Sequence, residues 1–435
     1  MRYAPRQKNK KLIWKIVSII ILVTVCVVAW ITQYSARQNE QKEKFSVCNL
    51  QSDALLSALN KSYKNTISVK DYLYYGESLD LYEQTYSVEN KDTLSGKTVE
   101  LYNVCSKQSV SMTMENYVDQ KIRLDELSAG FYEVYIMDNL VRKRVVFDGD
   151  LQKNNYQTIK RNNKVYNIQL IADQSLLKDY EVTLDKPYLF LQVDSVQPDA
   201  NDIDVLIDPY GMNMDLQTVP DEGNQADGLV ENDEMYEAAL LLKEELESYG
   251  LRVGISKANK DEAGKAYGSD GRLSKGYKQN AKYYLLLRMN AYGNDQARGF
   301  ELQHSYYVSS TMARGIAYRM HKNLGITLSN MYNGEDEGVV RSSLIQSELD
   351  NKNIYDINLY LRESGGRALM AGRFSQTSQS ENKDFVNANG MHGLEVDFGY
   401  MTNKSDVAYW KQHKKQIVKE FAKAYLEALN IETVD

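Results

Sequence analysis

The chain has 435 residues, which is enough for two or three domains. Its hydrophobic content of 43% and charged content of 26% are typical of globular proteins. The formal net charge of −7 argues against nucleic acid as the main partner, because binding phosphates requires a basic face. We therefore expect a globular protein with no nucleic-acid partner.

The first informative segment is an apolar run at residues 12–32, interrupted only by Lys15 and small hydroxyl residues. Its length is about that of a helix that crosses a bilayer core of ~30 Å. The basic residues on its N-terminal side are Arg2, Arg6, Lys8, Lys10, Lys11 and Lys15. This asymmetry predicts a basic cytoplasmic tail (1–11), a transmembrane anchor (12–32) and an extracellular remainder, and hence a single-pass protein of the cell membrane.

A cleaved signal peptide is the alternative interpretation of this segment. The apolar run is longer than the ~7–15 residues typical of such a peptide, and no clear Ala-x-Ala cleavage site follows it. Cys26 lies inside the predicted anchor, whereas Cys48 and Cys105 lie beyond it. In an exported protein these two cysteines either form a disulfide or remain two separate buried thiols.

Residues 33–44 are polar and charged, which predicts a stalk. From residue 45 to 197 the chain consists of short runs rich in Tyr, Val, Ile and Leu that alternate with polar residues, and turn residues separate these runs. This pattern predicts an all-β, sandwich-like module. The module contains no set of residues typical of a catalytic site, so we interpret it as a spacer or a partner-binding unit.

After a linker at 196–203, predicted strands alternate with long helical periods, a pattern typical of an α/β domain. A short apolar strand, VLID, ends in Asp208-Pro209, and YYLLLRM (283–289) and GLEVDFGYM (393–401) are further strands. Amphipathic helices are expected at 233–249 and 407–429. We therefore predict an α/β domain at 202–431, with a mixed sheet flanked by helices.

Four motifs of this domain occur in an order that resembles a known family. They are Ile-Asp-Pro at 207–209, Glu231 at the start of a long helix, LLLRMNAYG around Asn290, and VDFGYMTNKSD from residue 396. The domain resembles the zinc-dependent N-acetylmuramoyl-L-alanine amidases, which cut bacterial cell walls. The resemblance implies an α/β fold, peptidoglycan as the substrate, a zinc site with two His ligands and one Glu ligand, and a catalytic Glu.

The sequence departs from this family at the residues that hold the metal. The first His position falls on Tyr210 or Gly211, Arg288 replaces the second His, and Asp397 replaces the catalytic Glu. Only Glu231 is retained, although catalytic zinc takes three protein ligands and Arg cannot serve as one. We therefore predict a degenerate metal site at Glu231, Arg288 and Tyr210, with no bound cofactor where active relatives hold zinc. Asp397 is the candidate catalytic residue, but its side chain is one methylene shorter than Glu.

The substitution at Arg288 suggests a specific hypothesis. A guanidinium placed between Glu231 and Asp397 would replace the charge of the zinc ion with an internal salt-bridge cluster. Glu395 shares a face with Asp397 and is an alternative acid at this position. A relocated zinc site that uses His304 or His392, which both flank strands of the sheet, is a further alternative.

Candidate substrate contacts are Asn290 and the arginines of the cationic stretch 358–373, namely Arg362, Arg367 and Arg373. These arginines would bind the carboxylates of a peptide stem, or they belong to a solvated loop. We predict a membrane-anchored cell-wall protein that binds peptidoglycan, or regulates other cell-wall enzymes, without cutting the wall. A divergent but active amidase, and a scaffold that acts through the β module, are the alternatives, so enzymatic activity stays open.

Overall fold

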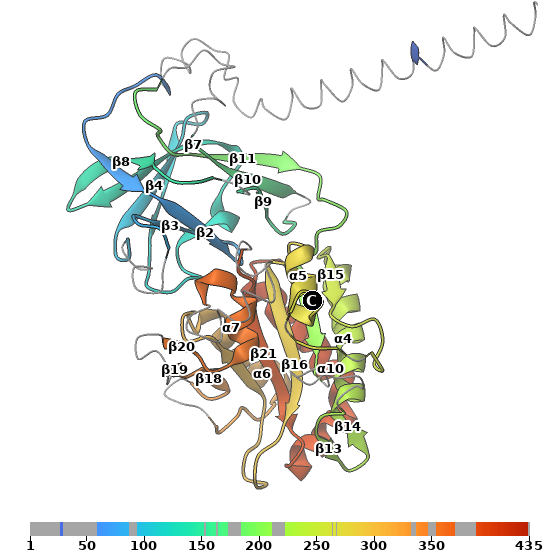
Figure 1. Cartoon of the computed structure of the whole chain (residues 1–435). Coiled ribbons are helices and arrows are strands. Elements are labelled where there is room, and N and C mark those ends of the chain that lie inside the picture. The colour runs from blue at the N-terminus through green and yellow to red at the C-terminus, as the bar shows by residue number, and fades with distance from the viewer. Residues whose placement is uncertain are drawn as a thin grey trace, which may run out of the picture.

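The structure is a computed structural model of the whole chain (Figure 1). It describes residues 27–28, 59–86, 94–151, 154–161, 164–172, 184–210, 222–262, 264–266, 268–331, 336–346, 354–369 and 389–433. The predicted tail (1–11) and stalk (33–44) lie outside these residues, as does most of the predicted anchor.

The predicted membrane anchor is not supported. Within the described ranges, no helix is both long enough and apolar enough to cross a membrane. The longest described helices, α4 (Glu231–Ser248) and α10 (Lys404–Ala428), contain many Lys and Glu residues, whereas a membrane span needs about 20 mainly apolar residues. This finding corrects the predicted transmembrane helix and the predicted single-pass location in the cell membrane.

The N-terminal module is built from two sheets. The larger has eight strands in the order β1-β8-β7-β11-β10-β9, with β4 paired to β7 and β5 paired to β4, and the smaller has the order β2-β3-β6. Side chains of both sheets share one hydrophobic core, which is the arrangement predicted from the alternating pattern. The strands are β1 (Thr66–Val69), β2 (Asp71–Tyr75), β3 (Ser78–Tyr82), β4 (Thr98–Asn103), β5 (Gln108–Thr113), β6 (Ile122–Arg123), β7 (Gly130–Asp138), β8 (Val141–Phe147), β9 (Tyr156–Gln157), β10 (Val165–Ile171) and β11 (Phe190–Val196). A short 3₁₀ helix, η1 (Leu124–Glu126), follows β6.

Cys105, at the end of the β4–β5 turn region, is disulfide-bonded. The other two cysteines of the chain, Cys26 and Cys48, lie outside the described residues. The alternative of a free buried thiol therefore does not apply to Cys105.

The C-terminal domain contains a six-stranded mixed sheet of order β15-β12-β16-β21-β17-β18. The strands β15, β12, β16 and β21 run parallel to one another, whereas β17 is antiparallel to β21. The strands of this sheet are β12 (Val205–Pro209), β15 (Val253–Ile255), β16 (Tyr283–Asn290), β17 (Glu301–His304), β18 (Val339–Arg341) and β21 (His392–Tyr400). Two small ribbons accompany it, formed by β13 (Gln225–Ala226) with β14 (Leu229–Val230) and by β19 (Leu344–Gln346) with β20 (Ile354–Asp356).

Helices cover both faces of this sheet (Figure 1). On one face, α4, α6 (Thr311–Leu324) and α10 pack against the strands around the fully buried Trp410 and Phe421. On the other face, α5 (Arg272–Lys278) and α7 (Leu359–Ser364) pack through Leu273, Tyr277 and Tyr360. A 3₁₀ helix, η2 (Gly366–Ala368), follows α7. The central strands are buried on both sides, which explains their continuous apolar sequences.

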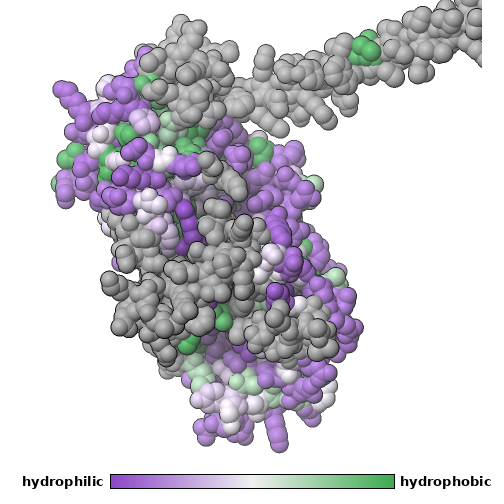
Figure 2. Space-filling view, in the orientation of Figure 1, coloured by the Kyte–Doolittle hydropathy of each residue, from purple (hydrophilic) through white to green (hydrophobic). Residues whose placement is uncertain are grey.

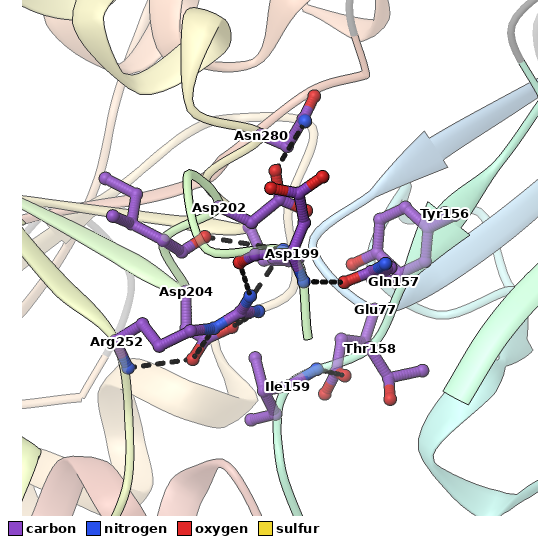
Figure 3. Close-up of polar contacts among 12 residues, drawn as sticks. Glu77, Tyr156, Gln157, Thr158, Ile159, Asp199, Asp202, Asp204, Arg252 and Asn280 are labelled. Carbon is purple, nitrogen blue, oxygen red and sulfur yellow. Dashed lines mark hydrogen bonds and ion pairs between the residues drawn. The ribbon is translucent and has the colours of Figure 1, made fainter. Parts of the chain in front are cut away.

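Polar contacts hold the linker between the domains in place (Figure 3). The Asp199 N–H donates to the Gln157 side chain of the N-terminal module at 3.1 Å, and Arg252 donates to the Asp204 carboxylate at 2.6 Å. On the other side of the linker, Asn280 donates to Asp202 at 2.8 Å. The linker is therefore bonded to both domains and does not act as a free tether.

The two domains also share a hydrophobic cluster. Leu73, Tyr75 and Val118 of the N-terminal module pack in one buried group with Val308 and Leu369 of the C-terminal domain. Backbone hydrogen bonds join Tyr74 and Gly76, at the β2–β3 turn, to Gly390, just before β21. In the face shown in Figure 2, hydrophilic residues cover most of the described surface, and hydrophobic residues form small separate groups.

Candidate functional site

The first motif of the site is the end of β12, where Asp208 is fully buried. Its carboxylate accepts hydrogen bonds from Ser256 Oγ at 2.5 Å, Arg272 Nε at 2.7 Å and Tyr284 Oη at 2.7 Å. All three partners belong to neighbouring elements of the sheet or to α5. Asp208 therefore anchors the strand end and has no role at the surface of the site. The next residue after Pro209, Tyr210, is partly exposed, and Gly211 lies outside the described residues.

Glu231 is the first residue of α4, and its fully buried carboxylate is held by three N–H groups. Oε2 accepts from the backbone and the side chain of Asn224 at 2.8 and 2.7 Å, and Oε1 accepts from the Met289 N–H at 2.9 Å. A register shift in the β16–β21 pairing between Arg288 and Asn290 places this N–H outside the regular ladder. Gly223 permits the close approach, because a Cβ there would lie 2.8 Å from Glu231 Oε2.

Arg288 extends from β16 into the space between the carboxylates. Its Nη1 lies 2.8 Å from Glu395 Oε1, and its Nε lies 3.9 Å from Glu231 Oε1. The guanidinium also lies over the Tyr210 ring, 4.6 Å from the centroid. Burial alone would lower the pKa of Arg288, but the carboxylates of Glu395, Asp397 and Glu231 raise it above its ordinary value. Arg288 is therefore a permanent cation at this site.

The predicted second partner of Arg288 was Asp397, and the structure places Glu395 there instead. Asp397 lies directly across from Arg288 in the β16–β21 pairing, and Glu395 lies two residues earlier on the same face of β21. The long Arg288 side chain reaches diagonally to Glu395, whose other oxygen accepts from Asn358 Nδ2 at 2.8 Å. The cluster in the structure therefore joins Arg288 to Glu231 and Glu395, and it differs from the prediction in its second carboxylate.

Asp397 is completely buried, and within the described residues neither of its oxygens has a hydrogen-bond partner. Burial raises the pKa of Asp397 well above its usual value, and the Glu395 carboxylate adds to the rise. Burial also raises the pKa of Glu301, which lies opposite Asp397 on β17 and accepts a hydrogen bond from Tyr400 Oη at 2.9 Å. Both effects favour the protonated, neutral form of the Asp397 carboxyl group.

Residues 217–430 match the family model for N-acetylmuramoyl-L-alanine amidases. The C-terminal domain belongs to this amidase family. Among solved structures, the catalytic domain of the amidase CwlV from Bacillus (Paenibacillus) polymyxa var. colistinus is similar, with 12% identity over 52% of this chain and 98% of that chain and a TM-score of 0.35. The amidase Ami1 from Mycobacterium smegmatis is similar with 15% identity over 53% of this chain and 97% of that chain and a TM-score of 0.35. No curated protein matches the chain.

The residues of the amidase-family domain do not fit the zinc ion of this family. In the described part of the chain, no group of three His, Cys, Asp or Glu side chains is placed so that it could hold a metal ion. The Glu231 carboxylate is engaged by three N–H donors, and a cation, Arg288, lies 3.9 Å from it, at the position that the resemblance assigns to the second His ligand. A divalent ion would be repelled by the guanidinium, which cannot lose its proton.

The two histidines considered for a relocated zinc site make their own local contacts and do not take part in this cluster. His304 is at the end of β17, where its Nδ1 lies 2.9 Å from the Ser305 carbonyl oxygen. His392 begins β21 and packs between the rings of Tyr75 and Tyr283, with centroids 5.4 and 5.9 Å away. Neither belongs to a group that could hold a metal ion among the described residues.

The predicted substrate contacts are distributed over three places. Asn290 is at the end of β16, close to the site, and its side chain accepts from the Ala291 N–H at 2.8 Å. Arg362 is 1% exposed and paired with Glu363 at 3.1 Å, so it presents no surface to a ligand. Arg367 is bonded to Asp71 of the N-terminal module at 2.9 Å. Arg373 lies outside the described residues.

Three residues of the site were missed by the sequence analysis: Asn224, Asn358 and Glu301. Asn224 and Asn358 each donate a side-chain N–H to one of the site carboxylates, and Glu301 faces Asp397. Asn358 is also the N-cap of α7, where its side chain accepts from two backbone N–H groups. No pattern in the sequence indicates the contact between Asn358 and Glu395, because these residues lie on different elements and 37 positions apart.

Proposed function

We propose that the amidase-family domain binds peptidoglycan, or regulates its hydrolysis by other enzymes, and does not cleave it by zinc catalysis. The observation that carries this proposal is Arg288, whose guanidinium lies 2.8 Å from Glu395 and 3.9 Å from Glu231. Metal-dependent hydrolysis requires a zinc ion that holds and polarises the attacking water. An internal cation occupies the place of that ion here.

The position of the catalytic Glu supports the same proposal. Asp397 is fully buried, and burial raises its pKa well above the usual value, which favours the protonated form over the ionised base. A general base must be ionised and within hydrogen-bond reach of the water that it activates. Asp397 meets neither requirement, so the acid–base half of the family's chemistry is also lost.

Ligand binding at this site relies on the partly exposed side chains at its rim. The Arg288 side chain is 22% exposed and lies over the Tyr210 ring, so Arg288 and Tyr210 together present a cationic and aromatic surface. Such a surface suits the amides and carboxylates of a muramoyl peptide. The carboxylates beneath Arg288 offset part of its charge, so its attraction for a ligand carboxylate is weaker than that of an unpaired arginine.

The test combines three measurements on the purified protein: zinc content by mass spectrometry, co-sedimentation with purified peptidoglycan, and release of stem peptides. We expect co-sedimentation, no stoichiometric zinc and no peptide release. Tyr210→Ala should weaken co-sedimentation several-fold, whereas Tyr318→Ala, at an exposed tyrosine on α6, should leave it unchanged. Stoichiometric zinc together with peptide release would establish the active-amidase alternative instead.

A further inference from the structure

A cavity of about 310 Å³ lies between the two domains, away from the degenerate zinc site. Its walls come from the β2–β3 turn and residues 119–125 of the N-terminal module, and from the starts of α6 and β21 and the end of α10 in the C-terminal domain. His392 in its wall begins β21, and Asp397 follows five residues later on that strand. At a rise of about 3.3 Å per residue, the cavity and the degenerate site are separated by roughly 16 Å along β21.

The charges around this cavity do not balance. Arg161 pairs with Glu77, and Arg123 pairs with Asp125. Glu427, a further acid of the lining, pairs with Arg319 outside it. Asp119 remains, and within the described residues no Lys, Arg or His side chain forms an ion pair with it. Its two oxygens accept only from the backbone N–H of Ser309 at 2.9 Å and from the Ser309 hydroxyl at 2.7 Å. A carboxylate can accept about four hydrogen bonds, so Asp119 has capacity left for a cationic donor.

The rest of the lining is polar and aromatic. Hydroxyl and amide groups come from Ser78, Thr311, Gln120 and Asn430, and the rings of Tyr75 and Tyr283 form part of the wall. Within the described residues, His392 Nε2 and Arg161 Nε are buried and lack a hydrogen-bond partner. Unsatisfied buried polar atoms are rare and often mark a place where a water or ligand binds.

An exposed glycine in the first half of α6 lies at the wall of the cavity. Gly315 lines the cavity, and a Cβ built on it meets no atom within 4 Å. Its φ angle is not in the left-handed region, so the backbone does not require glycine. Glycine inside a helix is destabilising by about 1 kcal/mol relative to alanine. Neither packing nor backbone geometry therefore requires glycine at this exposed position, and a larger side chain here has room to extend over the cavity.

We propose that this interdomain cavity is a binding site for a small compound with a protonated amine and several hydroxyl groups, of the amino-sugar class. The amine is bound by Asp119, and the hydroxyls are bound by the hydroxyl and amide side chains of the lining. Because residues of both domains contact the ligand, binding stabilises their docking. This site is independent of the degenerate zinc site and of the function proposed for it.

The experiment is isothermal titration calorimetry of the full-length protein with glucosamine, glucose and ethylamine at a pH where the amines are protonated. We expect glucosamine to bind, and glucose and ethylamine to bind much more weakly. Asp119→Asn should weaken glucosamine binding at least about tenfold, because a charge-assisted hydrogen bond is lost. Glu244→Gln is the matched control, since Glu244 is an exposed acid on α4, and it should leave the affinity unchanged.

Gly315→Leu provides a second test that does not alter charge. Leucine fills the cavity and raises helix propensity, so we expect glucosamine binding to be abolished in a protein that unfolds at an unchanged or higher temperature. Absence of glucosamine binding to the wild-type protein, or unchanged binding in Gly315→Leu, would overturn the proposal. Equal affinity for glucose would overturn the role of Asp119, and equal affinity for ethylamine would overturn the role of the hydroxyls. Peptidoglycan co-sedimentation should be unaffected by Gly315→Leu, which separates this proposal from the function proposed above.

Discussion

Replacing Arg288 by methionine tests whether this residue stabilises the site as an internal cation. Methionine keeps the apolar stem of the side chain and removes the guanidinium that lies 2.8 Å from Glu395 and 3.9 Å from Glu231. Glu231 and Glu395 are almost fully buried, and both carboxylates lose their nearby cation. The substitution should therefore destabilise the domain.

The size of the effect follows from burial. Removal of one partner of a buried ion pair destabilises a protein by about 3–5 kcal/mol. Because 22% of the Arg288 side chain is exposed, we expect the lower end of that range, about 3 kcal/mol at neutral pH. Arg288→Lys keeps the charge but lacks the planar fork, so we expect a loss of about 1 kcal/mol.

The deficit should depend on pH. Burial already raises the pKa of both Glu231 and Asp397 in the folded protein, and Arg288 opposes the rise. Without Arg288 these pKa values rise further, so the folded variant binds more protons than its unfolded state. The deficit should therefore be largest at neutral pH and shrink as the pH falls toward about 5. Urea unfolding followed by circular dichroism at both pH values measures it, and a pH-independent loss below about 1 kcal/mol would refute the role of Arg288.

Three further substitutions test other contacts. Asp397→Asn should raise the free energy of unfolding by about 1 kcal/mol at neutral and alkaline pH. The pKa of Asp397 is raised in the folded protein, so the wild type loses stability as the pH rises through that pKa, and the variant does not. A destabilised variant in urea unfolding would argue for an ionised Asp397. Glu231→Gln should lower the free energy of unfolding by about 2–3 kcal/mol, because the new amide N–H₂ group faces N–H donors that bond the carboxylate in the wild type. Thermal unfolding should show a clearly lower midpoint temperature. Arg367→Ala removes the hydrogen bond to Asp71, and we expect faster hydrogen–deuterium exchange at the backbone amides of residues 74–77; unchanged exchange would mean that this bond does not contribute to domain docking.

The strands and helices that carry the site could be predicted because their signals are local. The apolar run before Asp208-Pro209 forms β12, and YYLLLRM covers most of β16. The first helix begins at Glu231, two residues before its predicted start, because the Glu231 N–H donates to the Asn224 carbonyl oxygen at 2.9 Å. That contact joins residues on either side of a small ribbon, and no periodic pattern reports it.

The partners of the site residues could not be predicted in the same way. Period-two alternation correctly places Glu395 and Asp397 on one face of β21, but it does not say which of them an arginine on the neighbouring strand will reach. The arginines of α7 and η2 were expected at a ligand groove, whereas Arg362 is buried beside Glu363 and Arg367 bonds the N-terminal module. Whether a charged side chain faces solvent, a ligand or another domain depends on the docking of two domains far apart in sequence.

The charge balance of the site explains how several buried carboxylates are held together at the strand ends. Zinc would supply two positive charges to this group of carboxylates, and Arg288 supplies one. The remaining negative charge is reduced by protons, since burial raises the pKa of Glu231, Glu301 and Asp397 in the folded protein. N–H donors from Asn224 and Met289 hold the Glu231 carboxylate as well. One arginine and the raised pKa values together offset the charge of the grouped carboxylates, so the strand ends keep their arrangement.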